Sequence, residues 1–236
     1  MAGNPHGLEA LTPTQMLETF FNAQIASQAW PILLAGLGNT LLLSVCVVPL
    51  GLAGGLILAI LAGLRSPWVR WPLMAWVDFF RAFPPLVLLI LLFAGLPFAG
   101  LQLSGFACVC IAFFLNTGAY YGEILRAGIE SVPSGQTEAA RSTGLGRVQT
   151  MRFVVLPQAV RNVLPDLLSN TLEVVKLTSL GSVVAMPELL FQARQAQSLT
   201  YNPTPIVLAA LVYFLMLWPL VRVLSRMENR ALAGRG

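Results

Sequence analysis

Three long stretches without a charged side chain constrain this chain more than any other feature. Residues 31–64, 82–122 and 195–221 contain no Asp, Glu, Lys or Arg. A transmembrane helix needs about 20 consecutive apolar residues, and each stretch is longer than that. Only 10% of the 236 residues are charged, against roughly 25% in an average soluble domain. We therefore expect an all-α polytopic membrane protein, with residues 1–236 forming one transmembrane domain.

The basic residues lie mostly between the apolar stretches, which is the positive-inside pattern that sets the orientation of membrane proteins. This distribution argues against nucleic-acid binding, despite the net charge of +4. Residues 1–29 contain Glu9 and Glu18 but no Lys or Arg, which favours the outside of the cell. The segment after residue 221 contains Arg222, Arg226, Arg230 and Arg235. We therefore expect the N-terminus outside and the C-terminus in the cytoplasm.

The sequence predicts five transmembrane helices, at about 31–64, 72–97, 101–121, 164–187 and 205–221. The fourth is the least apolar, because it contains Asp166, Asn170, Glu173 and Lys176. Parity still requires it. The Arg-rich loop at about 123–163 and the tail after residue 221 are both expected inside, so an even number of crossings must separate them.

Two features of the first two spans predict local structure. Gly51, Gly54, Gly55 and Ala59 place small residues at helical spacing, which suits close helix packing in lipid. Arg81 has two readings: it snorkels to the cytoplasmic interface, or it belongs to a site. Residues 16–25 are compatible with a short interfacial helix, which the sequence does not settle.

The sequence offers little for catalysis or for metal binding. His6 is the only histidine, and Cys46, Cys108 and Cys110 lie in apolar runs without a Cys-x-x-Cys pair. We expect no catalytic residue, no metal site and no disulfide framework. The chain has no Gly-x-x-x-x-Gly-Lys-Ser/Thr phosphate loop, so we expect no bound cofactor and no ATP hydrolysis by that route. No basic segment precedes the first apolar run, so no cleavable signal peptide is expected.

The polar stretch Ser131–Pro165 predicts a compact helical hairpin between spans. A first helix is expected over Gln136–Thr143, after the start signals Pro133 and Ser134. Glycines at 144 and 146 break it, and a second helix over Arg147–Leu156 is expected to stop at Pro157. The small side chains beside residue 138 leave room for another protein to approach the backbone closely.

The spacing of this hairpin resembles the EAA loop of binding-protein-dependent ABC importer permeases. The match runs through Glu138, Ala139, Ala140, Gly144, Val154, Leu156 and Pro157. Val154 is the one departure within the pattern, since the family usually has Ile there. The segments 120–129, 131–136 and 156–162 resemble the sequences that flank this loop in the family.

Two further segments resemble the polar amino-acid branch of this family. Residues 80–86 are similar to its Phe-Arg-Gly-Thr-Pro-Leu-Leu segment, with departures at Ala82 and Phe83. Lys176, Thr178 and Ser179 match its Lys-x-Thr-Ser run, with a leucine where the family often has Asp. The resemblance implies a polar amino acid or a derivative, such as an opine, as the solute.

The resemblance also implies the architecture and the partners. It implies a type I ABC importer permease-like fold, with five transmembrane helices and a cytoplasmic coupling helix pair, in the inner (plasma) membrane. The coupling residues it implies are Glu138, Ala139, Ala140, Arg141, Gly144, Leu156 and Pro157. They contact an ABC ATP-binding subunit dimer, which carries the ATP and Mg. The other implied partners are a second permease subunit, identical or different, a periplasmic solute-binding protein, and membrane lipid.

Charged residues within the fourth span are candidates for the solute pathway, because an ionised group there costs about 2.5–3.5 kcal/mol on insertion scales. Glu173 and Lys176 are three residues apart on one helix face. They either neutralise each other or line the path together with Asn170, Thr178 and Ser179.

Two other classes of function remain. One is a self-sufficient channel or secondary transporter for a small polar solute; the other is an intramembrane enzyme, which the lack of histidine disfavours.

Overall fold

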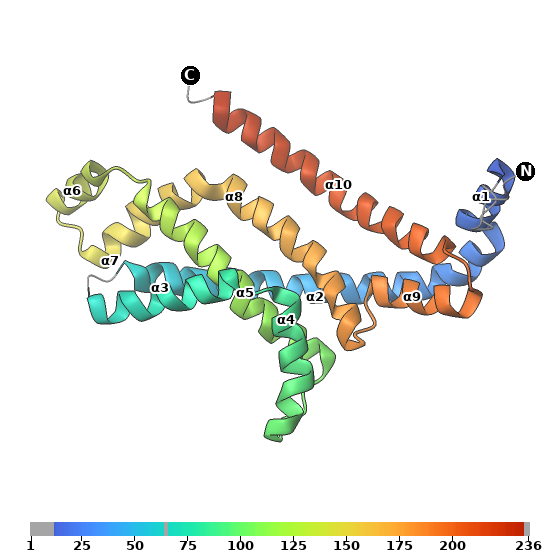
Figure 1. The fold of residues 1–236 in the computed structure, drawn as a ribbon. Helices are drawn as coiled ribbons and strands as arrows, with labels where there is room; N and C mark the ends of the chain where they lie inside the picture. Colours follow the sequence, from blue (N-terminus) through green and yellow to red (C-terminus); the bar gives the residue numbers. More distant parts are fainter. Residues whose placement is uncertain (1–11, 64–65, 234–236) are drawn as a thin grey trace, which may run out of the picture.

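The computed structural model describes residues 12–63 and 66–233, and every regular element within those ranges is a helix (Figure 1). In chain order they are α1 (Pro13–Phe20), α2 (Ala23–Ala62), α3 (Pro67–Ala82), α4 (Pro85–Ile90), the π-helix η1 (Leu91–Gly95), the 3₁₀-helix η2 (Leu96–Ala99), α5 (Gly105–Glu130), α6 (Ser134–Ser142), α7 (Arg147–Thr150), the π-helix η3 (Met151–Val155), α8 (Leu156–Leu177), the 3₁₀-helix η4 (Thr178–Val184), α9 (Leu189–Thr200) and α10 (Thr204–Ala233).

Three segments are long and apolar enough to cross a bilayer on their own: Pro13–Ala62, Gly105–Glu130 and Thr204–Met227. Two bent helix pairs also pass that test. One joins Pro67–Ala82 to Pro85–Ala99 at 96°, and the other joins Arg147–Val184 to Leu189–Thr200 at 46°. The number of candidate spans rises to five if each bent pair crosses once, which agrees with the number expected from the sequence. The crossings themselves remain a prediction.

The long helix α2 begins earlier than the first expected span. The side-chain oxygen of Asn22 accepts hydrogen bonds from the backbone N–H groups of Gln24 and Ile25, both at 3.0 Å, and so caps the helix. The helix then runs for 40 residues through Pro31 and Pro49. At 1.5 Å per residue this is about 60 Å, roughly twice the hydrocarbon core of a bilayer. Leu64, the last residue of the expected span, lies outside the described residues.

The glycines of α2 allow close packing against α5, as the sequence predicts. A Cβ atom on Gly51 would lie 2.4 Å from the Thr117 hydroxyl oxygen, and one on Gly55 would lie 2.5 Å from the Cβ atom of Tyr121. The main hydrophobic cluster is built on this contact, with Leu43 and Val47 of α2 fully buried beside residues of α5. The pair α2 and α5 is therefore the centre of the molecule.

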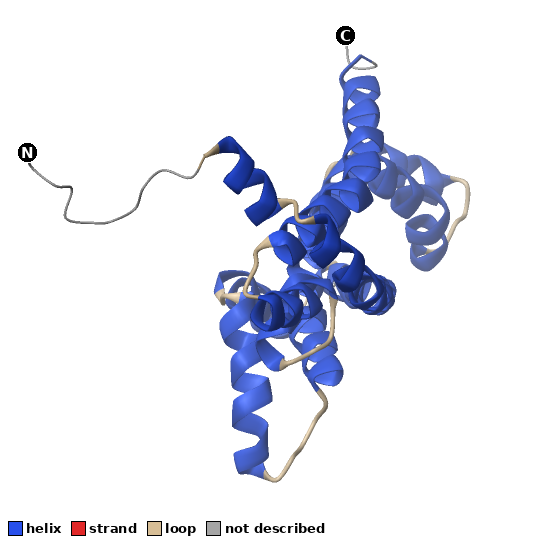
Figure 2. Ribbon diagram, turned by 90° about the vertical axis from the view of Figure 1, so that its right-hand side faces the viewer, coloured by secondary structure: helices blue, strands red, loops and turns tan. Residues whose placement is uncertain are grey.

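The second expected span, 72–97, is not one helix. Consecutive prolines at 84 and 85 end α3, and Phe83 is extended at φ −79°, ψ 126°, as residues before proline usually are. The segment from α4 to η2 then turns away and projects from the body, downward in both Figures 1 and 2. Leu88 and Leu89 at its base are buried in the main hydrophobic cluster, but the rest is mostly exposed and apolar, and Phe98 near its tip is 95% exposed.

The expectation that a helix stops at Pro157 is wrong. Pro157 does not stop a helix; it lies in the first turn of α8, where its missing N–H costs little. The π-type bond from Leu156 N to Met151 O shifts the hydrogen-bond register just before this proline, and the chain continues as a helix. The region between residues 187 and 205, for which the sequence predicts no element, contains the helix α9.

A second hydrophobic cluster lies apart from the main one. Ala29 and Leu33 of α2 pack there against Leu189, Ala193 and other apolar residues of α9 and α10. In Figure 1, α9 lies beside the first part of α2, at the opposite end of the molecule from α6. The hydroxyl oxygen of Thr204 ties α10 to this end, because it accepts a hydrogen bond from Asn22 N at 3.1 Å.

Candidate functional site

The hairpin of α6 and α7 stands at one end of the molecule, as Figure 1 shows. The first helix begins two residues earlier than predicted and ends at Ser142. Glu138, Ala139 and Arg141 are exposed, whereas Ala140 is buried at 7% exposure. The two alanines therefore do not share one open face. The accessible part of the motif is a glutamate, an alanine and an arginine.

Gly144 makes the turn between the two helices. Its φ of +89° lies in the left-handed region, which favours glycine. Gly144 N donates to Arg141 O at 3.0 Å, and Leu145 N donates to Ala140 O at 3.3 Å. These two bonds form a Schellman motif, which satisfies carbonyl groups at the end of α6. The turn expected from the sequence at this glycine is confirmed.

The hairpin is fixed to the helices on both sides of it. Val132, just before α6, forms a small buried cluster with Val155 of η3 and Ala159 of α8. The side-chain amide of Asn162 donates to the hydroxyl oxygen of Ser131 at 2.8 Å, which joins α8 to the end of α5. Leu156 and Pro157 lie in the first turn of α8, behind the hairpin. The two ends of the hairpin are therefore connected to α5 and to α8.

An ion-pair network lies on α3 and α5. The sequence does not predict it. Arg126 donates to both oxygens of Glu123, at 2.7 and 2.9 Å, and also pairs with Glu130. Arg81 lies 3.9 Å from Glu123, and its guanidinium stands 5.6 Å from the centre of the Tyr120 ring. Arg81 thus lies in a polar cluster with residues of α5, and both of its roles, snorkelling to the interface or belonging to a site, stay predictions.

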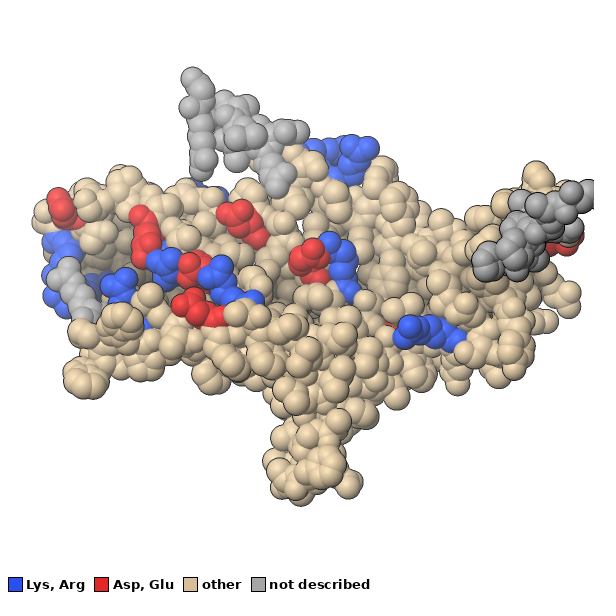
Figure 3. Space-filling view, in the orientation of Figure 1, with Lys and Arg blue, Asp and Glu red and all other residues tan. Residues whose placement is uncertain are grey.

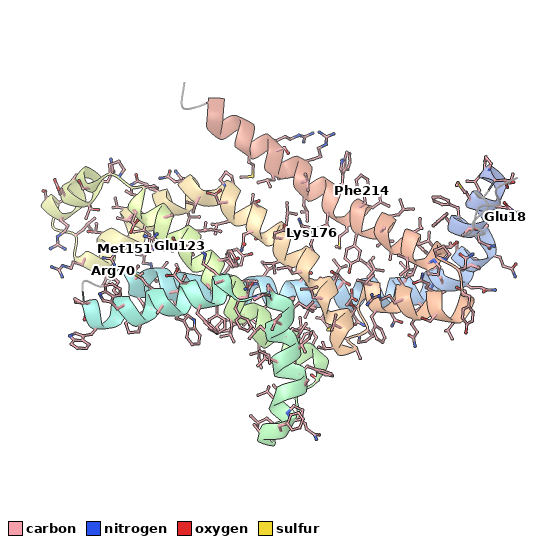
Figure 4. The ribbon with its side chains drawn as sticks, in the orientation of Figure 1. Glu18, Arg70, Glu123, Met151, Lys176 and Phe214 are labelled. Carbon is pink, nitrogen blue, oxygen red and sulfur yellow. The ribbon has the colours of Figure 1, made fainter. Side chains whose placement is uncertain are left out.

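The same region contains a cavity of about 220 Å³ between α2, α3 and α5. Its polar lining comes from Arg70, Asp78, Glu123, Arg126 and Glu130. In Figure 4, Arg70, Glu123 and Met151 lie toward the α6 end, whereas Lys176 lies nearer the middle of the molecule. Figure 3 shows that charged side chains on this face gather toward the α6 end.

Two donors of α5 satisfy carbonyl groups that the prolines of the α3–α4 bend leave without partners. In a continuous helix, Phe80 O and Arg81 O would accept from residues 84 and 85, but both are proline and have no N–H. The Asn116 side-chain amide donates to Phe80 O at 2.7 Å, and the Tyr120 hydroxyl donates to Arg81 O at 3.1 Å. Asparagine and tyrosine one turn apart on α5 thus hold the bend.

Only part of the expected solute-pathway set comes together. Glu173 and Lys176 form an ion pair at 2.5 Å, and their side chains are 59% and 52% exposed. Thr178 is fully buried and donates to Val175 O, while Ser179 donates to Lys176 O. Both hydroxyls therefore bond to the end of their own helix. The side-chain nitrogen of Asn170 is buried without a hydrogen-bond partner.

Glu188 is a fully buried carboxyl group that sequence reasoning missed. Its side chain accepts from Leu190 N and Phe191 N, at 2.8 and 2.7 Å, and from the Tyr213 hydroxyl at 2.8 Å. The only local signal is a lone glutamate after Pro187 and before an apolar run.

Among the described residues, no group of three or more His, Cys, Asp or Glu side chains is placed to hold a metal ion. His6 lies outside those residues.

The family that matches this chain is described as the binding-protein-dependent transport system inner membrane component, over residues 55–232. The chain is 35% identical over 213 residues to the probable amino-acid ABC transporter permease protein YckA of Bacillus subtilis (strain 168), covering 90% of this chain and 92% of the relative. It is 34% identical over 206 residues to the octopine transport system permease protein OccM of Rhizobium meliloti, covering 83% and 84%. It is 32% identical over 209 residues to the glutamine transport system permease protein GlnP of Escherichia coli (strain K12), covering 86% and 94%.

Solved structures show the same arrangement of helices. A chain from the crystal structure of an amino acid ABC transporter with histidines matches with a TM-score of 0.78 at 34% identity, covering 86% of this chain and 96% of that one. A chain of the inward-facing MetNI methionine ABC transporter matches with a TM-score of 0.68 at 20% identity, covering 83% and 96%. The second likeness is one of fold alone.

Proposed function

Since this chain belongs to the family of binding-protein-dependent transport system inner membrane components, we propose that it carries a polar amino acid or an amino-acid derivative across the membrane. It is a multi-pass inner-membrane protein and the permease subunit of an ATP-driven ABC importer. Relatives named for amino acids, glutamine and octopine support the solute class. Family membership also favours this function over that of a self-sufficient channel or secondary transporter.

The α6–α7 hairpin is the contact with a separate ATP-binding subunit dimer. The observation that carries this assignment is the exposed pair Glu138 and Arg141 on a short helix that is anchored to both α5 and α8. Charged side chains there make charge-assisted contacts with a partner. Gly144 fixes the angle of the hairpin, so closure of the ATPase is passed to the spans as a rigid movement. ATP and Mg belong to that partner, and this chain catalyses no reaction.

The solute passes the exposed face of α8 that carries Glu173 and Lys176. A carboxylate and an ammonium group side by side match the two charged ends of an amino acid. One turn earlier, the amide nitrogen of Asn170 is buried without a protein partner, which makes Asn170 a candidate for the same pathway. Thr178 and Ser179 directly follow α8 and belong to the same set. Their hydroxyl groups donate to carbonyl groups at the end of α8, and the pathway continues from there.

The N-terminus faces outside and the C-terminus faces the cytoplasm. In this orientation α6 and α7 meet the ATPase, and the end formed by α1 and α9 meets the periplasmic solute-binding protein. A second permease subunit, identical or different, completes the pathway.

Reconstitution tests the solute class. Proteoliposomes containing this permease, its ATPase subunit and its binding protein are given a panel of polar amino acids, an opine and a neutral sugar. We expect one amino acid or opine to stimulate ATP hydrolysis and to be taken up, with no uptake from liposomes that lack the ATPase subunit. Stimulation by the sugar alone would contradict the solute class. Uptake without the ATPase subunit would contradict the whole assignment.

A further inference from the structure

Glu188 lies where three helices meet, and all of its hydrogen-bonding partners are inside the protein. One oxygen accepts from Phe191 N, and the other accepts from Leu190 N and from the Tyr213 hydroxyl. Burying a carboxyl group without partners is costly, and a helix N-terminus with a tyrosine hydroxyl supplies the donors that offset this cost. The side chain thus caps α9 and holds α10 at the same time.

The neighbouring residues tie the same point to α2. The Thr40 hydroxyl oxygen accepts from Leu189 N at 3.0 Å, and the Asn39 side-chain amide donates to Pro187 O at 2.8 Å. Gly36 allows the helices to come this close, because a Cβ atom there would lie 2.9 Å from the Leu189 Cα atom. Residues 187–189 are therefore held by side chains from helices distant in sequence.

The backbone changes character on the chain before this point. Thr178–Val184 forms a 3₁₀-helix, whose hydrogen bonds are weaker than those of an α-helix. Ala185 follows in the left-handed region at φ 53°, which is strained for a residue with a Cβ atom. Leu189 and Ala193 belong to the second hydrophobic cluster, whereas Val184 and Met186 belong to the main one. The boundary between the two clusters lies at residues 186–189.

We propose that Glu188 is a positioning residue that keeps three helical segments together as one body throughout the transport cycle. This three-helix unit consists of residues 29–40 of α2, residues 188–200, and residues 204–213 of α10. The chain bends in the segment 178–186. The contacts that residues 187–189 make with α2 and α10, which we call the Glu188 clamp, stay formed while it does so. The proposal rests on the proposed transport function, because it concerns how the spans move during transport.

A cross-link across the clamp tests whether it stays closed. Cys46, Cys108 and Cys110 are first replaced by alanine, and cysteines are then introduced by Asn39→Cys and Pro187→Cys. A short reducible bifunctional thiol reagent joins them in the assembled transporter. We expect solute-stimulated ATP hydrolysis and uptake to remain at the level of the untreated protein. Loss of both activities on cross-linking, with recovery on reduction, would overturn the proposal.

Each single-cysteine variant treated in the same way is the control for modification without a cross-link. An untreated transporter without solute-stimulated activity would instead count against the proposed function. The two failures are therefore distinguishable.

Removal of the Glu188–Tyr213 hydrogen bond tests the role of the carboxyl group. Tyr213→Phe deletes the hydroxyl, and Glu188→Asp shortens the side chain but keeps a residue type that caps helices well. We expect each variant to lose most of the solute-stimulated ATP hydrolysis and uptake while basal ATP hydrolysis and assembly persist. The double variant is expected to be no worse than either single one, because all three lack the same bond.

Tyr201→Phe is the matched control, since Tyr201 directly follows α9 and is 95% exposed. This variant makes the same chemical change, the loss of a tyrosine hydroxyl, at a nearby exposed position. We expect it to transport normally. Additive losses in the double variant would contradict a shared bond. Normal stimulated activity in well-assembled Tyr213→Phe and Glu188→Asp would remove Glu188 from any role in transport.

Discussion

At the scale of single residues, Gly144 is the position where one added methyl group has the clearest expected effect. Its φ is +89° and a Cβ atom would contact nothing within 4 Å, so Gly144→Ala adds backbone strain without a clash. The left-handed conformation costs a residue with a Cβ atom about 1–2 kcal/mol. We expect the variant to insert normally, to bind its ATPase subunit more weakly and to lose uptake. Co-purification and uptake measure these effects.

Gly135→Ala is the matched control for Gly144→Ala. Gly135 lies in the first turn of α6, its Cβ position is also open, and its φ is not in the left-handed region. Alanine is the better helix former there, so we expect normal coupling. Equal loss of uptake in the two variants would contradict the role given to the turn.

The pair Glu173 and Lys176 has two readings that double substitution separates. If the two residues only neutralise each other, Glu173→Gln leaves one unpaired charge, and adding Lys176→Gln should restore protein level and uptake. If they contact solute, both single variants and the double variant should assemble but lose uptake or change solute preference. We expect the second result, measured by competition among amino acids. Recovery of uptake in the double variant would leave the pair with a structural role alone.

Local sequence patterns predict Gly144 and Glu173 but not Glu188. A glycine between two short helices indicates a turn, and a glutamate three residues before a lysine indicates an ion pair, because the partners are close in sequence. Glu188 has partners on other helices, and Tyr213 is 25 residues away. No pattern around residue 188 distinguishes a buried clamp from a charged residue in a loop.

At the scale of secondary-structure elements, the bend between α3 and α4 depends on two hydrogen bonds from α5. Asn116→Leu keeps the side-chain size but leaves Phe80 O without a donor, and Tyr120→Phe does the same to Arg81 O. Hydrogen bonds between membrane helices contribute about 1–2 kcal/mol in model peptides. We expect each variant to lower the melting temperature of the detergent-solubilised protein, and the Asn116 variant more, because that residue is buried.

Thr117→Val is the control for these two variants. The Thr117 hydroxyl donates to Phe113 O within the same helix, so its loss leaves no carbonyl without a partner. A melting temperature as low as that of Asn116→Leu would mean that packing, and not the bend, sets the effect.

Prolines are poor predictors of where the helices of this chain end. The sequence predicts one span over residues 72–97, but the consecutive prolines at 84 and 85 break the helix there. The sequence also predicts that Pro157 ends a helix, whereas it lies in the first turn of α8, and Pro165 lies inside α8 without ending it. The helix breaks at residues 84 and 85, where donor groups of α5 take the place of the missing helical hydrogen bonds. Those groups come from tertiary contacts, which local patterns do not contain.

At the scale of the whole molecule, the two ends of the structure are predicted to lie on opposite sides of the membrane. Reporter fusions after Arg70 and Gly146 should report the cytoplasm, and a fusion near Gln197 should report the outside. Gly146 precedes α7, and Gln197 lies in α9, at opposite ends in Figure 1. A cytoplasmic signal at Gln197 would contradict the even number of crossings and the fourth span with it. Arg235, part of the basic tail, lies outside the described residues.

The separation of the two hydrophobic clusters has a consequence for how the chain is made. The first half of α2 is synthesised early, but its packing partners Leu189 and Ala209 emerge more than a hundred residues later. The second half of α2 meets α5 much sooner. A growing chain therefore completes one core while residues 29–37 still face lipid or the insertion machinery. A message truncated before residue 189 yields a protein whose main hydrophobic cluster is packed but whose residues 29–37 lack their partners. Membrane quality-control proteases can recognise such an exposed apolar surface.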